Sequence, residues 1–310
     1  MNPAGVVYAL LAYGAWGFVP IYWKWLTHLP PAELLSHRVL WTVVFCALLL
    51  TALRRWNEVR DALGRRRERF IVGGAALLLG TNWLIFLWAI ATDRIIDTSL
   101  GYYLNPLVNV VLGVGLLGER LRRAQGVAVG LAALGVTGLV IDHGGLPWIS
   151  LALAGTFGAY GLAHKLTTGV RPIPRLWIEA TVLSPIAAGF LAFFVEPAGG
   201  ALVTEPVPTR TLLVLAGPIT ALPLLWFASA ARRLPLSTLG LFQYIAPSLT
   251  LLIAVFLYAE PFTRAHGFAF ACIWFALALY TWDTRQATRP DARRYADGRN
   301  RSSKSAITRS

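Results

Sequence analysis

The chain has 310 residues, of which 56% are hydrophobic and 14% are charged, and its formal net charge at neutral pH is +13. A soluble globular protein carries about 25% charged residues, so this composition excludes that class and indicates a membrane protein. The net charge does not indicate nucleic-acid binding, because seven of the 28 Lys and Arg lie in 54–69 and eight lie in 285–309.

Ten apolar windows are predicted to form membrane-spanning helices, which need roughly 20 largely apolar residues each. The first begins near the N-terminus and has no small-residue cleavage site after it, so we expect it to be retained. The fifth and sixth are separated only by DHGGLP, which makes their boundary the least sharp. The windows cover approximately 5–25, 34–53, 70–91, 98–117, 124–141, 147–166, 176–195, 211–230, 237–258 and 265–282.

Both termini are expected in the cytoplasm. An even number of spans puts them on one side of the membrane, and this orientation places 23 of the 28 Lys and Arg in cytoplasmic segments. Positive charge favours the cytoplasmic side. The tail 285–310 is basic and poor in apolar residues, so it is predicted to be disordered and able to contact anionic lipid.

The chain is predicted to contain two five-helix repeats, 1–142 and 143–284, related by a shift of 141 residues. The stretch LGYYLNPLVNVVLGVGLLGE, with Pro106, matches GLFQYIAPSLTLLIAVFLYAE, with Pro247, and the same shift aligns glycines of the first and sixth spans. Five is an odd number, so the second repeat enters the membrane from the opposite side. Inverted repeats of this kind are a basis of alternating access and favour a transport function.

The residues also resemble a known family. The stretches LLAYGAWGFVPIYWKWL, ELLSHRVLW, NWLIFLWAI, SLGYYLNPLVNVVLGVGLLGERLR and LPLSTLGLFQYIAPSLTLLIAVFLYAEPF resemble RarD-type members of the EamA branch of the drug/metabolite transporter (DMT) superfamily. The likeness covers roughly 5–283. It implies ten helices in two inverted repeats, a central cavity formed largely by helices one, three, four, six, eight and nine, and a secondary carrier. RarD-type proteins carry a chloramphenicol-related label without a settled physiological substrate.

Polar side chains inside the fourth span are candidates for solute binding, because an unpaired polar group in hydrocarbon is costly. Tyr102, Asn105 and Asn109 are spaced by three and four residues and share one helical face. Pro106 lies on the adjacent flank and frees a carbonyl about one turn earlier. This face is either a cavity wall or a set of helix–helix contacts.

Further candidates come from three other spans. Asn82 lies deep in the third span, Trp16 lies beside two glycines in the first, and Gln243 aligns with Tyr102 under the 141-residue shift. Trp16 suits packing as well as a cavity. Both repeat-related prolines are predicted to distort their helices where irregular backbone can line a cavity. The predicted substrate-binding set is Trp16, Asn82, Tyr102, Asn105, Asn109 and Gln243.

A group of charges lies near the outer ends of the first two spans. Glu33 and His37 are four residues apart on one face, Arg38 lies to the side, and Lys24 ends the first span. They either form an internal ion pair that holds the two spans or serve in coupling or charge sensing, since His37 titrates near neutral pH. Arg38 aligns with Glu179, and the opposite charges argue against a shared role.

Glu119 and Glu260 end the fourth and ninth spans, where we expect a structural role. Each carboxylate can cap the start of the next helix or pair with a nearby arginine. The two cysteines, Cys46 and Cys272, lie in apolar runs and are predicted to be unpaired. No nucleotide-binding loop, metal-ligand spacing or nucleophile elbow occurs, so no cofactor, metal ion or catalytic residue is predicted.

The sequence therefore predicts a secondary transporter in the plasma membrane of a bacterium, which moves a small organic metabolite or drug by alternating access, with export as the favoured direction. Its partners would be that solute and the lipid bilayer, with protons as a candidate coupling ion. Two alternatives are an intramembrane enzyme acting on lipid or isoprenoid substrates and a structural membrane subunit. The residues leave the substrate, the coupling ion and the oligomeric state open.

Overall fold

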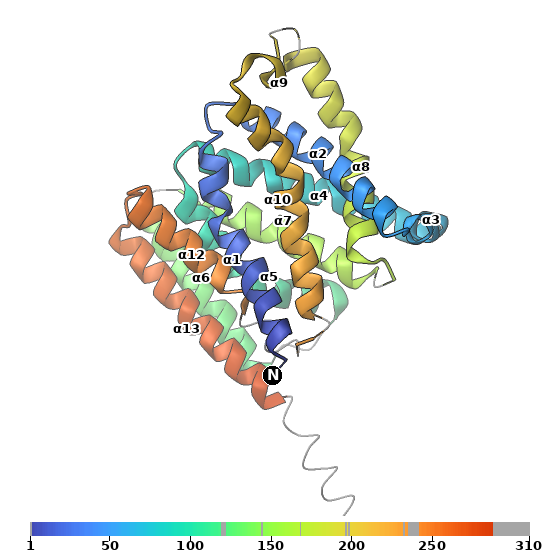
Figure 1. The fold of residues 1–310 in the computed structure, drawn as a ribbon. Helices are drawn as coiled ribbons and strands as arrows, with labels where there is room; N and C mark the ends of the chain where they lie inside the picture. Colours follow the sequence, from blue (N-terminus) through green and yellow to red (C-terminus); the bar gives the residue numbers. More distant parts are fainter. Residues whose placement is uncertain are drawn as a thin grey trace, which may run out of the picture.

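The computed structural model describes residues 2–118, 122–143, 145–167, 169–195, 197, 199–231, 233–234 and 242–287. Over these residues the regular structure is helical, without strands, which confirms the predicted all-helical class. Two short segments, η1 and η3, are π-helical. In chain order the elements are α1 (Pro3–Lys24), α2 (Pro31–Ala52), α3 (Trp56–Gly64), α4 (Arg66–Ala91), α5 (Ile95–Leu117), α6 (Arg123–His143), α7 (Trp148–Lys165), α8 (Pro172–Phe190), η1 (Leu191–Val195), α9 (Ala201–Thr204), α10 (Val207–Ala231), α12 (Ile245–Leu252), η3 (Ile253–Leu257) and α13 (Arg264–Ala287) (Figure 1).

Eight helices in the described part of the chain are long and apolar enough to cross a membrane. They occupy eight of the ten predicted windows. The sixth window is occupied by α7, and the ninth by α12 with η3; both are helical but are not among the eight. The last helix, α13, continues to Ala287, so the predicted tail begins inside it, and the remainder from 288 lies outside the described residues. The chain has the helices of a multi-pass membrane protein.

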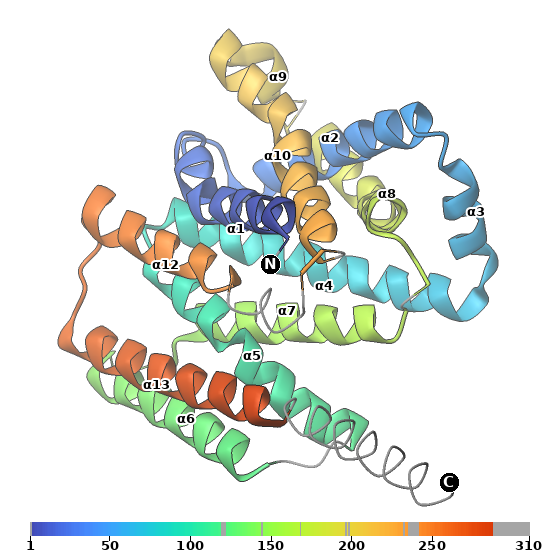
Figure 2. The same cartoon turned by 60° about the horizontal axis from the view of Figure 1, so that its bottom comes forward.

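The predicted basic connection 54–69 contains a short helix, α3, which Figure 2 shows at one edge of the molecule between α2 and α4. Trp56 at its start packs edge-on against Trp177 of α8, with ring centroids 5.1 Å apart. Glu58 accepts a hydrogen bond from Arg171 Nη1 at 2.8 Å. These contacts hold α3 against the start of α8.

Helices of the two halves pack against one another in a matching pattern. Figures 1 and 2 both show α6 side by side with α13, and α2 packs along α8 in the same way. In addition, α1 packs on α10 and α12, whereas α7 packs on α4 and α5. The 141-residue shift exchanges α1 with α7, α4 with α10 and α5 with α12. Under that exchange these pairings map onto one another, as expected for repeats related by a two-fold axis.

Close helix contacts depend on small residues. A Cβ atom placed on Gly217 of α10 would overlap the backbone carbonyl of Trp41 in α2. One placed on Gly101 of α5 would lie 2.9 Å from the carbonyl oxygen of Ser150 in α7. Small residues let membrane helices approach closely because lipid provides little hydrophobic force between them. Both contacts join helices from different halves.

Glu260 caps a helix from the other half of the chain. Its carboxylate accepts hydrogen bonds from the backbone N–H groups of Ile95, at 2.8 Å, and Ile96, at 2.9 Å, at the start of α5. The pKa of this carboxyl is raised, because the effect of burial exceeds that of the two hydrogen bonds, which lower it. We expected a structural role, either a cap on the next helix along the chain or a pair with a nearby arginine, and the structure shows a cap on α5 instead. Glu119 lies outside the described residues.

Replacing Glu260 by alanine should lower the free energy of unfolding by about 2 kcal/mol, since it leaves two buried N–H groups without acceptors. Denaturant titration of the protein purified in detergent measures this loss. Glu205→Ala is the control, because that carboxylate pairs with His28 nearer the surface, at 3.3 Å, and should contribute less than about 1 kcal/mol. Equal losses in the two variants would contradict the capping role.

Candidate functional site

Asn82 connects three helices in the interior. It lies on α4 and is only 1% exposed. Its side-chain nitrogen donates to the carbonyl oxygen of Leu153, at 3.1 Å, and to Oγ1 of Thr156, at 2.9 Å, both on α7. Its side-chain oxygen accepts from the hydroxyl of Tyr102 on α5, at 3.4 Å. The structure therefore joins two of the predicted binding residues, Asn82 and Tyr102.

Aromatic rings extend from this pair along α7. The ring of Tyr102 lies 6.0 Å from that of Phe86 and 5.9 Å from that of Phe157, edge to face in the second case. Phe157 in turn lies 5.9 Å from Tyr160. A row of aromatic rings therefore lies beside the Asn82–Tyr102 pair. These rings can contact the apolar part of an organic solute.

Arg38 reaches the same region from α2. Its Nε atom donates to Oγ1 of Thr220 on α10 at 3.0 Å. Its guanidinium carbon lies 4.0 Å from the ring centroid of Trp83 and 5.2 Å from that of Trp23. It is also close enough to Tyr102 for an electrostatic interaction. The guanidinium therefore lies among α1, α2, α4 and α10, beside the residues already described.

The structure separates Arg38 from the charges with which the sequence grouped it. Glu33 Oε1 lies 3.9 Å from Nε2 of His37 and accepts a hydrogen bond from the backbone N–H of Ala201 at 3.2 Å. Consecutive residues of a helix point about 100° apart, so His37 and Arg38 meet different neighbours. The predicted trio is not a single ion pair.

Lys24 also has a different partner from the one expected. Its ammonium group binds the carboxylate of Asp93, in the turn after α4, and donates to the carbonyl oxygen of Ile90 at 3.1 Å. It also lies 5.3 Å from the ring centroid of Tyr258. Lys24 thus ties the end of α1 to the end of α4 and is not part of the Glu33–His37 pair.

The two asparagines of α5 differ in their surroundings. Asn105 is buried, and its side-chain oxygen has no hydrogen-bond partner in the part of the chain that the structure describes. Asn109 is exposed, and its oxygen would lie 3.6 Å from a Cβ atom on Gly158 of α7. Asn105 therefore offers a buried acceptor, whereas Asn109 lies at the edge of the α5–α7 contact.

The two prolines are not equivalent. Pro106 lies within α5, and the chain is helical on both sides of it. Proline has no backbone N–H, so the carbonyl of Tyr102 lacks its usual donor within the helix. Pro247 lies in the first turn of α12, where no intrahelical donor is needed. Its carbonyl accepts a hydrogen bond from the Ser99 hydroxyl at 2.8 Å. The predicted distortion of a helix interior therefore does not apply to Pro247.

Trp16 lies apart from Asn82. Its ring packs against Tyr13, with centroids 5.4 Å apart, and against Phe227 of α10, at 5.9 Å. The structure thus places Trp16 in an aromatic group on α1 and α10, and Tyr102 in another group on α5 and α7. Gln243 lies before α12 and interacts with the hydroxyl of Tyr244.

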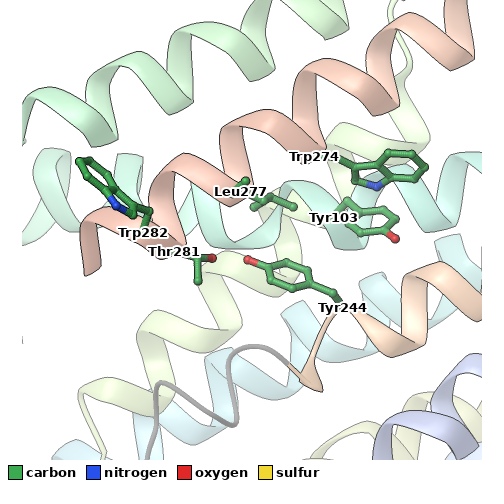
Figure 3. Close-up of a pocket in the computed structure, with 7 residues that line it drawn as sticks. Tyr103, Tyr244, Trp274, Leu277, Thr281 and Trp282 are labelled. Atoms are coloured by element: carbon green, nitrogen blue, oxygen red, sulfur yellow. The ribbon is translucent and has the colours of Figure 1, made fainter. Parts of the chain in front are cut away.

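Tyr244 belongs to a pocket between α5, the start of α12 and α13, with a volume of about 400 Å³ (Figure 3). Figure 3 shows the hydroxyl groups of Tyr244 and Thr281 facing each other, with Trp282 at one end. Tyr103 and Tyr244, which the 141-residue shift aligns, stack with centroids 6.3 Å apart. None of the described residues that line the pocket is charged. Its lining is Tyr103, Tyr244, Trp274, Leu277, Ala278, Thr281 and Trp282.

A second buried polar group lies on α7 and α8. Glu179 is fully buried, accepts a hydrogen bond from the Tyr160 hydroxyl at 2.9 Å, and lies 3.7 Å from Nε2 of His164. Arg175, one turn earlier on α8, donates to the carbonyl oxygen of Thr167. The sequence reasoning treated Glu179 only as the counterpart of an arginine. A carboxylate inside the predicted window 176–195 was the signal that could have identified it.

In the described residues, no group of three or more His, Cys, Asp or Glu side chains could hold a metal ion.

Comparison with known proteins gives several matches. The model of the EamA-like transporter family matches residues 3–141. The uncharacterized transporter YojE of Bacillus subtilis is 44% identical over 90% of this chain and 93% of its own. Protein RarD of Escherichia coli is 41% identical, over 90% and 94%. The chloramphenicol-sensitive protein RarD of Pseudomonas aeruginosa is 30% identical, over 94% and 97%.

The fold resembles that of a solved structure. A protein of known crystal structure aligns with a TM-score of 0.59 at 20% sequence identity, over 93% of this chain and 99% of its own. This level of identity supports a common helical arrangement and no more.

Proposed function

This chain belongs to the EamA-like transporter family as a RarD-type member, and we propose that it is a secondary transporter that exports a small organic metabolite or drug across the bacterial plasma membrane. Its relatives are named transporters. The observation that carries the proposal is the buried Asn82–Tyr102 pair with Arg38 beside it, where helices of both halves meet. Ionisable groups inside a membrane are expensive and are usually functional.

Alternating access would come from two inverted repeats, 1–142 and 143–284, with ten spans and both termini in the cytoplasm. Two observations support this arrangement. Exchanging each helix for its counterpart preserves the pairings between the halves. Tyr103 and Tyr244, which are counterparts, stack on each other where α5 meets α12. Rocking of one repeat against the other would then open a midplane site to each side in turn.

The solute would bind around Asn82, Tyr102 and Asn105. The Asn105 oxygen is buried without a hydrogen-bond partner among the described residues, so it can accept from a solute N–H or O–H group. The rings beside Tyr102 would contact the apolar part. Asn109 lies at the margin of this site. Trp16 and Gln243 lie in other groups, so their contribution would require a different conformation of the transporter.

Two pairs of a buried glutamate and a neighbouring histidine are candidates for proton coupling, Glu33–His37 and Glu179–His164. We place coupling at Glu179. The His164 side chain is 39% exposed and can exchange protons with water, whereas the His37 side chain is 4% exposed. Tyr160 donates a hydrogen bond to Glu179, and Arg175 lies close enough to Tyr160 for an electrostatic interaction.

The test is uptake into sealed proteoliposomes of aromatic amino acids, other amino-acid metabolites and chloramphenicol, with an imposed pH gradient present or absent. Chloramphenicol is included because it appears in the name of one relative. We expect at least one compound to accumulate only in sealed vesicles. Asn82→Leu should reduce that uptake about tenfold or more, a loss of about 1.4 kcal/mol, because it leaves the Tyr102 hydroxyl without its acceptor.

Asn57→Ala, on α3 outside the spans, is the matched control and should transport normally. If Asn82→Leu and Asn105→Ala both fold and transport as well as wild type, the site is elsewhere. Turnover of a lipid by detergent-purified protein, without compartments, would favour the enzyme alternative.

A further inference from the structure

We propose that Arg38 binds a carboxylate group of the transported solute, so that the substrates are small organic anions. This inference rests on the proposed transport function and adds the chemical class of the substrate. It assigns Arg38 to binding instead of to an internal ion pair.

Among the described residues, Arg38 forms no ion pair with an acidic side chain. Over the described residues it forms one hydrogen bond, from Nε to the Thr220 hydroxyl, and its Nη1 atom is buried without any partner. A buried charge is normally paired, because taking it out of water costs several kcal/mol. The missing anion is therefore expected to come from outside the chain.

The acidic groups of the neighbouring segments bind elsewhere. Glu33, one turn before Arg38 on α2, lies beside His37 and accepts from the Ala201 N–H. Asp93, after α4, binds Lys24. Neither carboxylate is left to neutralise Arg38.

The surroundings hold the guanidinium group in place. Trp83 contacts it at 4.0 Å and Trp23 at 5.2 Å, and an aromatic face stabilises a cation without neutralising it. Thr220 holds Nε. The remaining nitrogen atoms are the two ends of the planar fork that binds a carboxylate bidentately. The residue as a whole is only partly buried but Nη1 is fully buried, so a carboxylate would reach the fork when the transporter opens this region.

The position of Arg38 also determines how a bound solute would be oriented in the site. Tyr102 lies within electrostatic range of the guanidinium and donates to Asn82. A solute whose carboxylate meets Arg38 would thus place its remaining atoms toward Asn82 and Tyr102. The described neighbours of Arg38 are aromatic rings and hydroxyl groups, so the guanidinium provides the one positive charge among them. A single positive charge matches a monoanion better than a phosphate dianion.

Binding of matched acid and amide pairs to the purified protein tests the proposal. The probes are phenylacetate with phenylacetamide, benzoate with benzamide, and indole-3-acetate with indole-3-acetamide. We expect at least one acid, and not its amide, to raise the melting temperature of the wild-type protein in detergent. Arg38→Met should weaken the apparent affinity for that acid at least tenfold, and Arg38→Lys should retain part of it.

The stability of the variants separates binding from folding. Arg38→Met removes an unpaired buried charge, so its melting temperature without ligand should equal or exceed that of wild type. The control is Arg210→Met, at the start of α10. Arg210 is also half-buried and also donates through Nε, to the Glu205 carbonyl oxygen. This variant should bind the acid like wild type.

Three results would overturn the proposal: no acid stabilises the protein, an acid and its amide stabilise it equally, or Arg38→Met binds the acid like wild type. Proteoliposome uptake distinguishes this failure from failure of the transport function. Uptake of a neutral solute that persists in Arg38→Met would remove the anion assignment and leave the transporter intact.

Discussion

Glu179→Gln is expected to abolish solute accumulation driven by a pH gradient while leaving solute exchange close to the wild-type rate. Glutamine has nearly the same shape as glutamate and keeps an acceptor for the Tyr160 hydroxyl, which lies 2.9 Å away. It cannot bind or release a proton, so it would uncouple the gradient from the conformational cycle. The measurement compares gradient-driven uptake with counterflow, in proteoliposomes preloaded with the same solute.

Glu33→Gln is the matched control for this experiment. Glu33 is also a buried glutamate near a histidine, and its Oε1 accepts from the Ala201 N–H. We expect this variant to keep the dependence on the gradient. Wild-type accumulation by Glu179→Gln would contradict the assignment of coupling to Glu179. Loss of both solute exchange and gradient-driven accumulation would indicate that Glu179 has a structural role.

Gly217→Ala should destabilise the protein by about 3 kcal/mol or more, because overpacking that displaces backbone lies at the upper end of the usual range. The new Cβ atom would overlap the carbonyl group of Trp41 and lie 3.1 Å from the backbone nitrogen of Thr42. Backbone atoms cannot rotate away as a side chain can, so α2 and α10 would have to separate. The melting temperature and the yield of folded protein in detergent report the loss.

Gly155→Ala is the control for this prediction. Gly155 lies within α7, and a Cβ atom there would meet nothing within 4 Å. Its alanine variant should be as stable as wild type, or more stable by up to about 1 kcal/mol, since alanine favours a helix over glycine. Similar stability of the two alanine variants would show that α2 and α10 pack less closely than the structure indicates.

The family and the helical elements could be predicted because both depend on local properties of the sequence. Length and hydropathy define an apolar helix, so the predicted window 34–53 and the observed α2, Pro31–Ala52, differ mainly at the start. That difference has a local cause as well, because proline favours the first position of a helix. The short helix α3 was missed, since its polar sequence differs little from that of a basic loop.

The candidate site was predictable only in part. The polar character of Asn82, Tyr102 and Asn105 inside apolar spans identified them as residues that need partners. The partners of Asn82 on α7, Leu153 and Thr156, are about seventy residues away from it along the chain. No spacing rule connects them, because the contact depends on how α4 packs against α7.

The sequence by itself determined that this protein is helical, embedded in a membrane and related to a family of transporters. It also identified the side chains that are costly to place in lipid. Only the tertiary structure decided which groups those side chains meet. Glu260 caps α5 and not the following helix. Arg38 turns from Glu33 and His37 toward Trp83 and Thr220. Helix packing brings distant residues together, and the direction of each side chain around its own helix decides which of them it reaches.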